Sequence, residues 1–420
     1  MKHRRFKTLT GVVLALALVA AACGGGAEPP VAGPLGQVTI ADGEAVQIRS
    51  FNAITGDVSF LGIPNQRGVE LAIEDYGEIL GHPISMGTGL DDLCSADGGQ
   101  AGAQTIVSDP QILGVIGTSC SGAAGAAMPL ISDAGLVMIS GSNTSPALTS
   151  DLAGNASSDY NVGYYRTAHN DLYQGRAVAE FAFNELGMRN AGVIHDGDLY
   201  TFGLSSAFQA AFEELGGEVS VFTAVNKGDT DMTAVLTEIA AGSPDMLFTP
   251  TFPPEINFIA QQVRGVAGME DVTLIGADAS LVDNFLEIPE AAGWYHSGPD
   301  TRFGANENSI TGVSGDTFLT AYQEQYGEAP SAAFWAHSYD ATTMLLKAIE
   351  ESATDVDGTL YVDRQGVRDA LNAISLDGII GPITCDDFGD CGAQLITVIL
   401  NDSPNDVEAA KANVVFEFSP

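Results

Sequence analysis

Three stretches of the chain place apolar residues at the spacing of a helix that buries one face. Apolar positions recur there at intervals of three and four residues, which predicts amphipathic helices. The three sets are Val69, Ala72, Ile73 and Tyr76; Leu204, Phe208, Ala211, Phe212 and Leu215; and Met232, Val235, Leu236 and Ile239.

Short apolar runs lie between these helices and predict strands. They are ILGVIG (112–117), LVMIS (136–140), AGVIH (191–195), MLFTP (246–250) and VTLIG (272–276). Each run is too short for a core helix and is flanked by Gly, Asp or Pro, so we predict buried parallel strands. Strands that alternate with helices favour an α/β fold, with helices on both faces of parallel sheets. The 420 residues exceed one ordinary core, so two domains are expected.

The start of the chain has the pattern of an export signal. Basic residues at positions 2, 4, 5 and 7 precede the apolar run GVVLALALVAAA, which is shorter than the roughly 20 residues of a membrane-spanning helix. The run ends in AAAC at 20–23, small residues before a cysteine, and resembles a bacterial lipobox. We predict a signal peptide over residues 1–22 and a lipid on Cys23. An ordinary signal peptide, cut nearby, is the alternative.

Residues 23–42, which include AEPPVAGPLG, are expected to form a flexible, lipidated tether. No later stretch is long and apolar enough to cross a membrane. The predicted location is therefore outside the cytoplasm, anchored to the cell membrane by the lipid.

Charge narrows the range of partners. Without the signal peptide, 12 basic residues face 54 acidic ones, a formal charge near −42. Nucleic acid is excluded as a partner because phosphate binding needs a positive surface. The acidic excess is interpreted as a solvated coat that keeps an exported protein soluble.

Four cysteines remain after Cys23, and an even number in an exported chain predicts two disulfides. A zinc site is the alternative. The cysteines lack CxxC spacing and the six histidines are scattered, so neither a metal nor a cofactor is expected.

Polar loops follow four of the predicted strands. They are TSCSG (118–122), GSNT (141–144), DGDLY (196–200) and AD (277–278). Ligands of parallel sheets bind where such loops emerge. The first two loops offer hydroxyl, amide and backbone N–H donors that suit a carboxylate, and the last offers an anion, so together they suit a zwitterion. Each loop alone also fits an ordinary helix cap.

A family resemblance extends over six ordered segments, which are VIGTSCSGAA, GLVMISGSNTSPALT, YYRTAHNDLYQGRAVAEFA, GVIHDGDLYTFG, FLTAYQEQYGEAPSAAFWAHSYDATTMLLKAI and GIIGPITCDDFGD. Together they resemble the leucine/isoleucine/valine-binding proteins. These are type I periplasmic binding proteins that feed ATP-binding-cassette importers. The resemblance covers the chain from about Val46 to its end.

The resemblance implies two Rossmann-like α/β lobes with parallel sheets, joined by three crossover segments that form a hinge. Carried over, lobe 1 comprises residues 43–168 with 299–384, and lobe 2 comprises 169–298 with 385–420. The implied protein is a monomer that is not an enzyme. It captures an amino acid, branched-chain or otherwise apolar, and delivers it to a membrane permease.

On lobe 1 the resemblance implies a binding site for the carboxylate. The carboxylate-binding serine of the family falls on Ser121. Its second loop falls on Ser142, Asn143 and Thr144, where backbone and hydroxyl groups hold the same carboxylate.

On lobe 2 the resemblance implies binding of the ammonium group and cover for the side chain. The family tyrosine falls on Tyr200, and the ammonium-binding acid falls on Asp278, one methylene shorter than the commoner Glu. Two aromatic positions of the family correspond to Leu61 on lobe 1 and Phe252 on lobe 2. These changes predict a more apolar pocket.

The resemblance also pairs Cys94 with Cys120, next to the loop that carries Ser121. Cys385 and Cys391 flank DDFGD, a hairpin that relatives usually close without a disulfide. Five intervening residues permit closure, so an added disulfide is expected at this edge of lobe 2. A calcium loop is the alternative for these carboxylates, but the EF-hand spacing is missing.

Two further functions stay open. The same fold could bind an amide, urea or an aromatic acid, or act as a sensor. A hydrolase using Ser121 or Asp355 is a different class. GTSCSG lacks the final glycine of a nucleophile elbow, and DVDGT (355–359) follows a helix rather than a buried strand, so catalysis is disfavoured.

Overall fold

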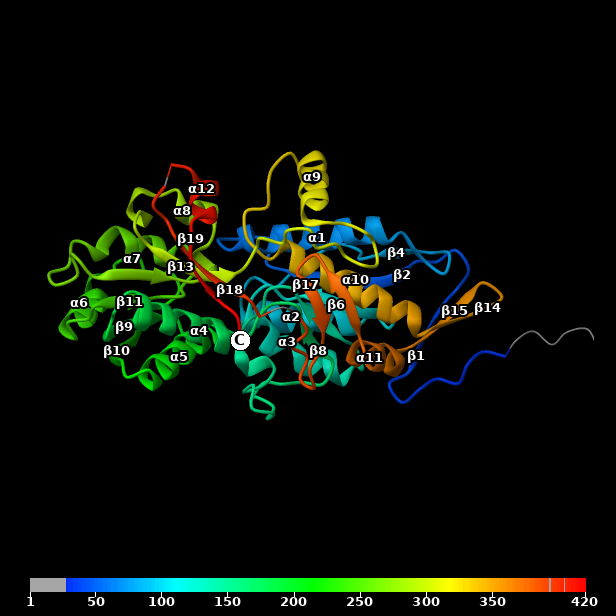
Figure 1. Cartoon of the computed structure of the whole chain (residues 1–420). Coiled ribbons are helices and arrows are strands. Elements are labelled where there is room, and N and C mark those ends of the chain that lie inside the picture. Colours follow the sequence, from blue (N-terminus) through cyan, green and yellow to red (C-terminus); the bar gives the residue numbers. More distant parts are fainter. Residues whose placement is uncertain (1–27, 393, 404) are drawn as a thin grey trace, which may run out of the picture.

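The computed structural model of the chain describes residues 28–392, 394–403 and 405–420. The predicted signal peptide and Cys23 lie outside these residues. Two α/β lobes lie side by side in Figure 1, and each has its own sheet. The fold prediction is therefore confirmed.

Lobe 1 is built on the sheet order β3-β4-β2-β6-β7-β8. Its strands are β2 (Val46–Asn52), β3 (Glu78–Ile79), β4 (His82–Ser85), β5 (Leu90–Asp91), β6 (Ile112–Gly117), β7 (Met138–Ser140) and β8 (Tyr164–Arg166). All pairs in it are parallel except β3 with β4. Two apolar cores cover its two faces, one built with α2 and α3 and the other with α1 and α10. The helices are α1 (Ser59–Tyr76), α2 (Ala96–Val107), α3 (Ser121–Asp133), α9 (Gly315–Tyr326), α10 (Trp335–Glu351) and α11 (Arg364–Asn372).

Lobe 2 is built on the sheet order β10-β9-β11-β12-β13-β18-β19. Its strands are β9 (Asn190–His195), β10 (Glu218–Ala224), β11 (Met246–Phe248), β12 (Thr273–Gly276), β13 (Tyr295–Pro299), β18 (Ile396–Leu400) and β19 (Val414–Phe418). The first five strands in chain order are parallel, whereas β18 runs antiparallel to both of its neighbours. The helices are α4 (Asp171–Glu180), α5 (Leu199–Glu214), α6 (Thr233–Ala241), α7 (Glu255–Val263), α8 (Asp283–Leu286) and α12 (Val407–Ala412). α4 and α5 pack together below the sheet in Figure 1, with α7 above it.

The hydrophobic pattern predicted these elements closely. All five apolar runs contain strands, β6, β7, β9, β11 and β12, and the three periodic sets lie on α1, α5 and α6. The chain passes between the sheets three times, after β8, after β13, and between β17 (Gly381–Thr384) and β18. These passages lie close to the predicted lobe boundaries, which follow residues 168, 298 and 384. The exact boundaries stay a prediction.

The predicted flexible tether extends too far. Residues Gln37–Ile40 form β1, which pairs antiparallel with β15 (Thr359–Asp363), itself paired with β14 (Ala353–Val356). Val38 and Ile40 are buried against lobe 1, because their alternate spacing places both on one face of the strand. The tether prediction is therefore wrong for residues 37–40, where an apolar alternation outweighs the Pro- and Gly-rich residues before it.

Both cysteine pairs, Cys94–Cys120 and Cys385–Cys391, are bonded. The loop 385–391 does not lie at an edge of lobe 2 as expected. It follows the hairpin of β16 (Ser375–Gly378) and β17, and it packs on lobe 1 beside β8. Phe388 meets the ring of Tyr160 edge-on at 5.6 Å between centroids.

Gly389 shows why the loop can lie there. Its φ is +89°, and a Cβ at this position would stand 2.2 Å from the carbonyl oxygen of Tyr164. The third passage between the lobes thus lies directly against the end of β8, an approach that only glycine permits.

Candidate ligand site between the lobes

The loop on lobe 1 that is predicted to bind the carboxylate, residues 118–122, leads into the amino end of α3. Ser121 is its first residue, and the preceding N-cap residue, Cys120, provides no side-chain hydrogen bond to the helix. The Ser121 hydroxyl accepts a hydrogen bond from the backbone N–H of Ser145 at 3.3 Å. A helix start without a side-chain cap keeps N–H groups and a partial positive charge for an anion.

The loop before Ser121 is held by a carboxylate underneath it. Asp92 accepts hydrogen bonds from the backbone N–H groups of Ser119 at 2.6 Å and Cys94 at 2.7 Å. Burial raises the pKa of Asp92 to about 7, against the opposing effect of these hydrogen bonds. The Cys94–Cys120 disulfide ties the same two segments. The loop is therefore positioned from below before any ligand arrives.

The second loop, after β7, uses its three predicted residues differently. Ser142 donates to the carbonyl of Ser119 at 3.0 Å and accepts from Asn65. The Asn143 amide is engaged at both ends inside lobe 1, by the Thr118 carbonyl and the Tyr164 hydroxyl among others. Its backbone N–H donates to the Ser140 hydroxyl at 2.9 Å.

Thr144 is the member of this loop with unused hydrogen-bonding capacity. It is fully buried, and its hydroxyl oxygen has no partner of good hydrogen-bond geometry among the described residues, although it lies close enough to the Asp171 carboxyl to oppose the rise in the pKa of that group. Buried polar atoms are nearly always satisfied, so this hydroxyl marks a position where a ligand group fits.

Asp278 occupies the corresponding place on lobe 2, in a short 3-10 turn (Asp278–Ser280) directly after β12. One of its oxygens accepts hydrogen bonds at 2.8 Å from both the Tyr200 hydroxyl and the Gln174 amide. Loss of water around the group raises the pKa of Asp278 to about 6, although both hydrogen bonds oppose the shift. Tyr200, in the first turn of α5, packs against Phe252 at 5.4 Å between ring centroids.

Asp171 is a second acid of the site, and no motif in the sequence predicted it. It is the first residue of α4 and is fully buried, and neither of its carboxylate oxygens has a hydrogen-bond partner among the described residues. Its N–H donates to the Thr144 carbonyl at 3.0 Å. Burial and then the charge of Asp278 raise the pKa of Asp171 well above its ordinary value.

A signal for Asp171 was present in the sequence. The segment HNDLYQG follows β8, so it emerges at the carboxyl end of a strand, as the four predicted loops after β6, β7, β9 and β12 do. Gln174, one turn further along α4, accepts a hydrogen bond through its side-chain oxygen from Nε2 of His169 at 2.6 Å and thereby links Asp278 to the first passage between the lobes.

The two lobes contact each other around these residues. Ser145 on lobe 1 donates to the carbonyl of Leu199 on lobe 2 at 3.1 Å, and Lys227 on lobe 2 donates to the carbonyl of Cys94 at 3.4 Å. A Cβ on Gly122 would stand 2.6 Å from an oxygen of Asp198, so the starts of α3 and α5 nearly touch. The predicted lobe 1 and lobe 2 residues thus face one another.

Apolar residues from both lobes surround the same region. Leu61 and Phe334 of lobe 1 belong to one buried cluster with Tyr200 and Phe252 of lobe 2. Phe334, at the start of α10, was not predicted, because it precedes a helix instead of following a strand.

Two recesses flank the region. One, of about 260 Å³, is bounded by Val58 and Cys94 of lobe 1 and by Lys227 and Phe252 of lobe 2. Phe252 lines this recess and also belongs to the apolar cluster of the candidate site, so the recess continues that site.

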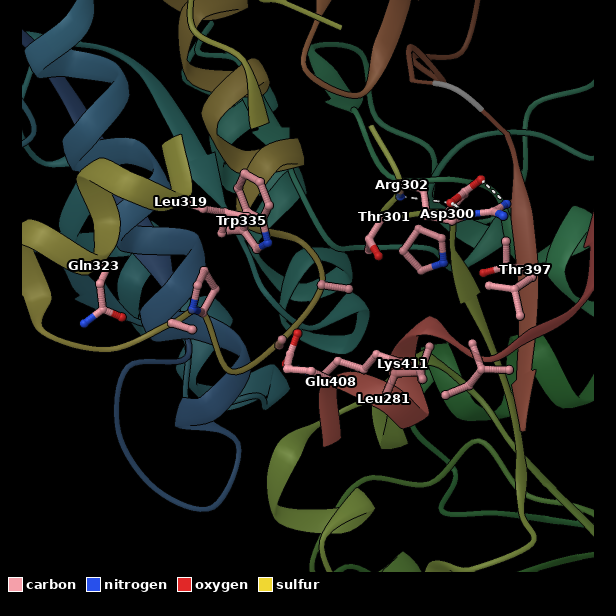
Figure 2. Close-up of a pocket in the computed structure, with 17 residues that line it drawn as sticks. Leu281, Asp300, Thr301, Arg302, Leu319, Gln323, Trp335, Thr397, Glu408 and Lys411 are labelled. Carbon is pink, nitrogen blue, oxygen red and sulfur yellow. Dashed lines mark hydrogen bonds and ion pairs between the residues drawn. The ribbon is translucent and has the colours of Figure 1, made fainter. Parts of the chain in front are cut away.

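The other recess, of about 340 Å³, separates α9 and Trp335 from β18 and α12 in Figure 2. None of the eight predicted ligand-binding residues lines it. Its two cations are neutralised, Arg302 by Asp300 and Glu417, and Lys411 by Asp283 and Glu408. It is therefore a weaker candidate for a charged ligand.

The alternative chemistries find little support in the described part of the chain. The one hydrogen bond of the Ser121 hydroxyl there is to a backbone N–H, and Asp355 lies in β14, where it caps a turn at Gly358. Within residues 28–392, 394–403 and 405–420, no cluster of three or more metal-binding side chains occurs. The same residues contain no helix with the length and hydropathy of a membrane span.

A comparison with known proteins shows which proteins this chain is similar to. A family model described as periplasmic binding protein matches residues 46–396. The leucine-, isoleucine-, valine-, threonine- and alanine-binding protein of Pseudomonas aeruginosa is 24% identical over 364 residues, covering 83% of this chain and 87% of that protein.

Two solved structures are similar in fold. A leucine-binding protein from Thermotoga maritima has a TM-score of 0.75 at 25% identity, over 90% of this chain and 99% of that one. A solute-binding protein from R. palustris, solved with benzoate, has a TM-score of 0.68 at 18% identity, over 89% of this chain and 96% of that one.

Proposed function

Because this chain belongs to the periplasmic binding protein family, we propose that it captures an amino acid between its lobes and delivers it to an ATP-binding-cassette importer. As a member of this family it is a binding protein and not an enzyme, so hydrolysis by Ser121 or Asp355 is set aside. One observation carries the proposal. A helix start without a side-chain cap and two neighbouring carboxylates adjoin the same loop of lobe 1, since Ser121 bonds to Ser145 and Asp171 bonds to Thr144.

The carboxylate of the ligand would bind lobe 1. Ser121 and the N–H groups at the start of α3 supply donors, whereas the backbone N–H groups of Ser142 and Asn143 already donate to the Ser140 hydroxyl. The Asp92 and disulfide supports keep these donors in place, which lowers the cost of ordering them on binding.

The ammonium group would bind between Asp278, Asp171 and Thr144. Among the described residues, both oxygens of Asp171 and the Thr144 hydroxyl have no hydrogen-bond partner. Two adjacent carboxylates are costly without a cation, and an ammonium group removes that cost. Hydrogen bonds to charged groups contribute roughly 1.5–3 kcal/mol each, so about four of them support an affinity of about 1 μM after the costs of ordering.

The side chain of the ligand would meet an apolar surface. Leu61, Phe252 and Phe334 are buried in the cluster that spans both lobes. This surface favours an aliphatic side chain, and the named ligands of the Pseudomonas aeruginosa relative are all small amino acids of this kind or close to it. Closure of lobe 2 over a ligand held on lobe 1 would complete the site.

The predicted lipid on Cys23 would keep the loaded protein near its permease and so raise its local concentration. Cys23 lies outside the described residues. The mass of membrane-extracted protein, compared with that of a Cys23→Ala variant, tests this part: equal masses of the processed chains would contradict lipidation.

The proposal is tested by calorimetric titration of leucine, isoleucine and valine into the mature protein. We expect binding near micromolar affinity for at least one of them and a loss of about 100-fold or more in Asp278→Ala. A Glu290→Ala variant, at an exposed acid of lobe 2, is the matched control and should bind like the wild type. Unchanged affinity in Asp278→Ala would contradict the role of this acid.

A second candidate is an aromatic acid or an amide. The raised pKa values of Asp278 and Asp171 favour it, because a protonated carboxyl can donate to a ligand that has no ammonium group. Thermal shift with benzoate, urea and simple amides, alongside amino acids, separates the two. Stabilisation by benzoate at pH 5 with none by amino acids at pH 8 would favour this candidate.

A further inference from the structure

Asp390 lies in the third passage between the lobes and contacts the first. Its side chain is almost buried, with 9% of the residue exposed. One oxygen accepts a hydrogen bond from Nε of Arg166 at 2.5 Å, and the other accepts from the amide of Asn170 at 3.1 Å. Backbone hydrogen bonds from Arg166 to Gly389 and from Cys391 to Arg166 align the two passages.

Arg166 links Asp390 to the loop 142–145 on lobe 1. The arginine is fully buried at the end of β8. Its guanidinium donates to the carbonyls of Ser145 at 2.8 Å and Asn143 at 3.3 Å, and to the Thr149 hydroxyl at 2.7 Å. The guanidinium therefore holds the backbone of the loop 142–145 from behind, and Asp390 fixes its orientation and compensates its charge.

Asn170 links Asp390 to the start of α4 on lobe 2. It is the N-cap of α4, and its side-chain oxygen accepts a hydrogen bond from the Leu172 N–H at 3.0 Å. The next residue is Asp171, the buried acid of the candidate site. A carboxylate that holds the amide of Asn170 thus helps to set where α4 begins and where Asp171 lies.

The loop that presents Asp390 is closed by a disulfide. Cys385 and Cys391 bracket it, and the Asp386 side chain accepts hydrogen bonds from the N–H groups of Phe388 and Asp390 at 2.9 Å. The disulfide therefore restrains the residue next to Asp390 and reduces the conformations open to its carboxylate.

We infer that Asp390, restrained by the Cys385–Cys391 disulfide, is a positioning residue that aligns both halves of the ligand site through Arg166 and Asn170. This rests on the proposed function for its effect on affinity. Its effect on the loop 142–145 and on the start of α4 is independent of the ligand. Asp390 touches no ligand itself.

The test uses two variants and a control in the mature protein. Asp390→Asn alone would leave Arg166 buried without its partner and would impair folding, so the pair is replaced together as Arg166→Met/Asp390→Leu. The second variant is Cys385→Ser/Cys391→Ser. Asp387→Asn is the matched control, because Asp387 lies in the same loop with its side chain exposed.

Amide hydrogen exchange and isoleucine titration are measured well below the unfolding temperature of each variant. We expect exchange at residues 142–145 and 170–173 to rise at least tenfold in both variants, and the affinity for isoleucine to fall at least tenfold. The control should stay within twofold in both measurements.

The outcomes distinguish this inference from the proposed function. A lower unfolding temperature with unchanged exchange and unchanged affinity means a purely structural role and overturns the inference. If the wild type binds no amino acid, the proposed function fails. Hydrogen exchange at the two segments then still decides whether Asp390 positions them.

Discussion

Asp171 and Asp278 show how single residues acquire a function that their neighbours in sequence do not reveal. Asp278 follows a strand and has two hydrogen-bond donors around one oxygen, whereas Asp171 starts a helix and has no donor on either oxygen within the described part of the chain. Burial raises the pKa of both groups, and the charge of Asp278 raises that of Asp171 further. A cationic ligand group would favour the ionised form of both.

The affinity for amino acids should therefore depend on pH. An ammonium group binds the ionised carboxylates, so affinity should be constant above the pKa of Asp171 and fall as the pH drops through about 6, the pKa of Asp278. The expected decrease is about tenfold per pH unit for each carboxyl that must lose its proton. Calorimetry between pH 8 and pH 5 measures it. A flat profile would contradict an ammonium group at this position.

Without ligand, the same shift acts on stability with a defined sign. The pKa of Asp278 is about 6 in the folded protein and 3.8 ordinarily, so the folded state binds more protons between these values. The contribution of this group to stability is full below pH 3.8 and is lost as the pH rises through 6. Asp278→Asn should hence raise the ligand-free unfolding temperature at pH 7.5 and not at pH 4. Equal shifts at both pH values would argue against this cause.

Elements of the fold bring the site together through close approaches of backbone. The parallel strands β6, β8 and β9 lead into α3, α4 and α5, and the starts of α3 and α5 meet where the lobes touch. The third passage adds its own contact at Gly389, where lobe 1 and the segment 385–391 meet without room for a Cβ.

Gly389→Ala should destabilise this junction. The added Cβ would meet the Tyr164 carbonyl at 2.2 Å on a residue with φ of +89°, so the cost combines a clash with backbone strain and should reach about 2–4 kcal/mol in the free energy of unfolding. Gly154→Ala is the control, since Gly154 has a φ of +92° and nothing within 4 Å of the added Cβ. Urea denaturation compares them. Similar losses in the two variants would mean that strain alone acts at Gly389.

The whole molecule depends on contacts that exist only when the lobes are together. Lys227 is one of the 12 basic residues left after the predicted signal, and it reaches from lobe 2 to lobe 1. Its ammonium group pairs with Asp198 at 3.1 Å and donates to the Cys94 carbonyl at 3.4 Å. The ion pair lies within lobe 2, so only the hydrogen bond to the Cys94 carbonyl joins the lobes, and its contribution to closure is modest.

Replacing this side chain should shift the molecule toward the open form. In Lys227→Met we expect ligand dissociation to become about two- to fivefold faster, which corresponds to roughly 0.4–1 kcal/mol for the lost hydrogen bond to the Cys94 carbonyl. Lys347→Met is the control, because the ion pairs of Lys347, to Glu350 and Glu351, lie within its own helix and do not join the lobes. Stopped-flow dissociation measures the rates. Equal rates in all three proteins would show that Lys227 does not stabilise closure.

Local patterns in the sequence determined the elements of this protein. Hydrophobic periodicity and turn residues act over a few positions, so they predicted the strands β6, β7, β9, β11 and β12, the helices α1, α5 and α6, and the α/β fold. The loops after the strands were predicted for the same reason, and with the family resemblance they led to Ser121, Thr144 and Asp278. The pairing of β1 with β15 was missed, because its partner lies more than 300 residues away.

Only the tertiary structure decided which atoms of these loops are free. Asn143 turned out to be engaged inside lobe 1, while Thr144 beside it and Asp171 have buried atoms without partners. Such differences depend on segments far apart in the chain, as with Arg166 and Asp390, 224 positions apart. Burial and hydrogen bonding are properties of that packing, and no local pattern of residues records them.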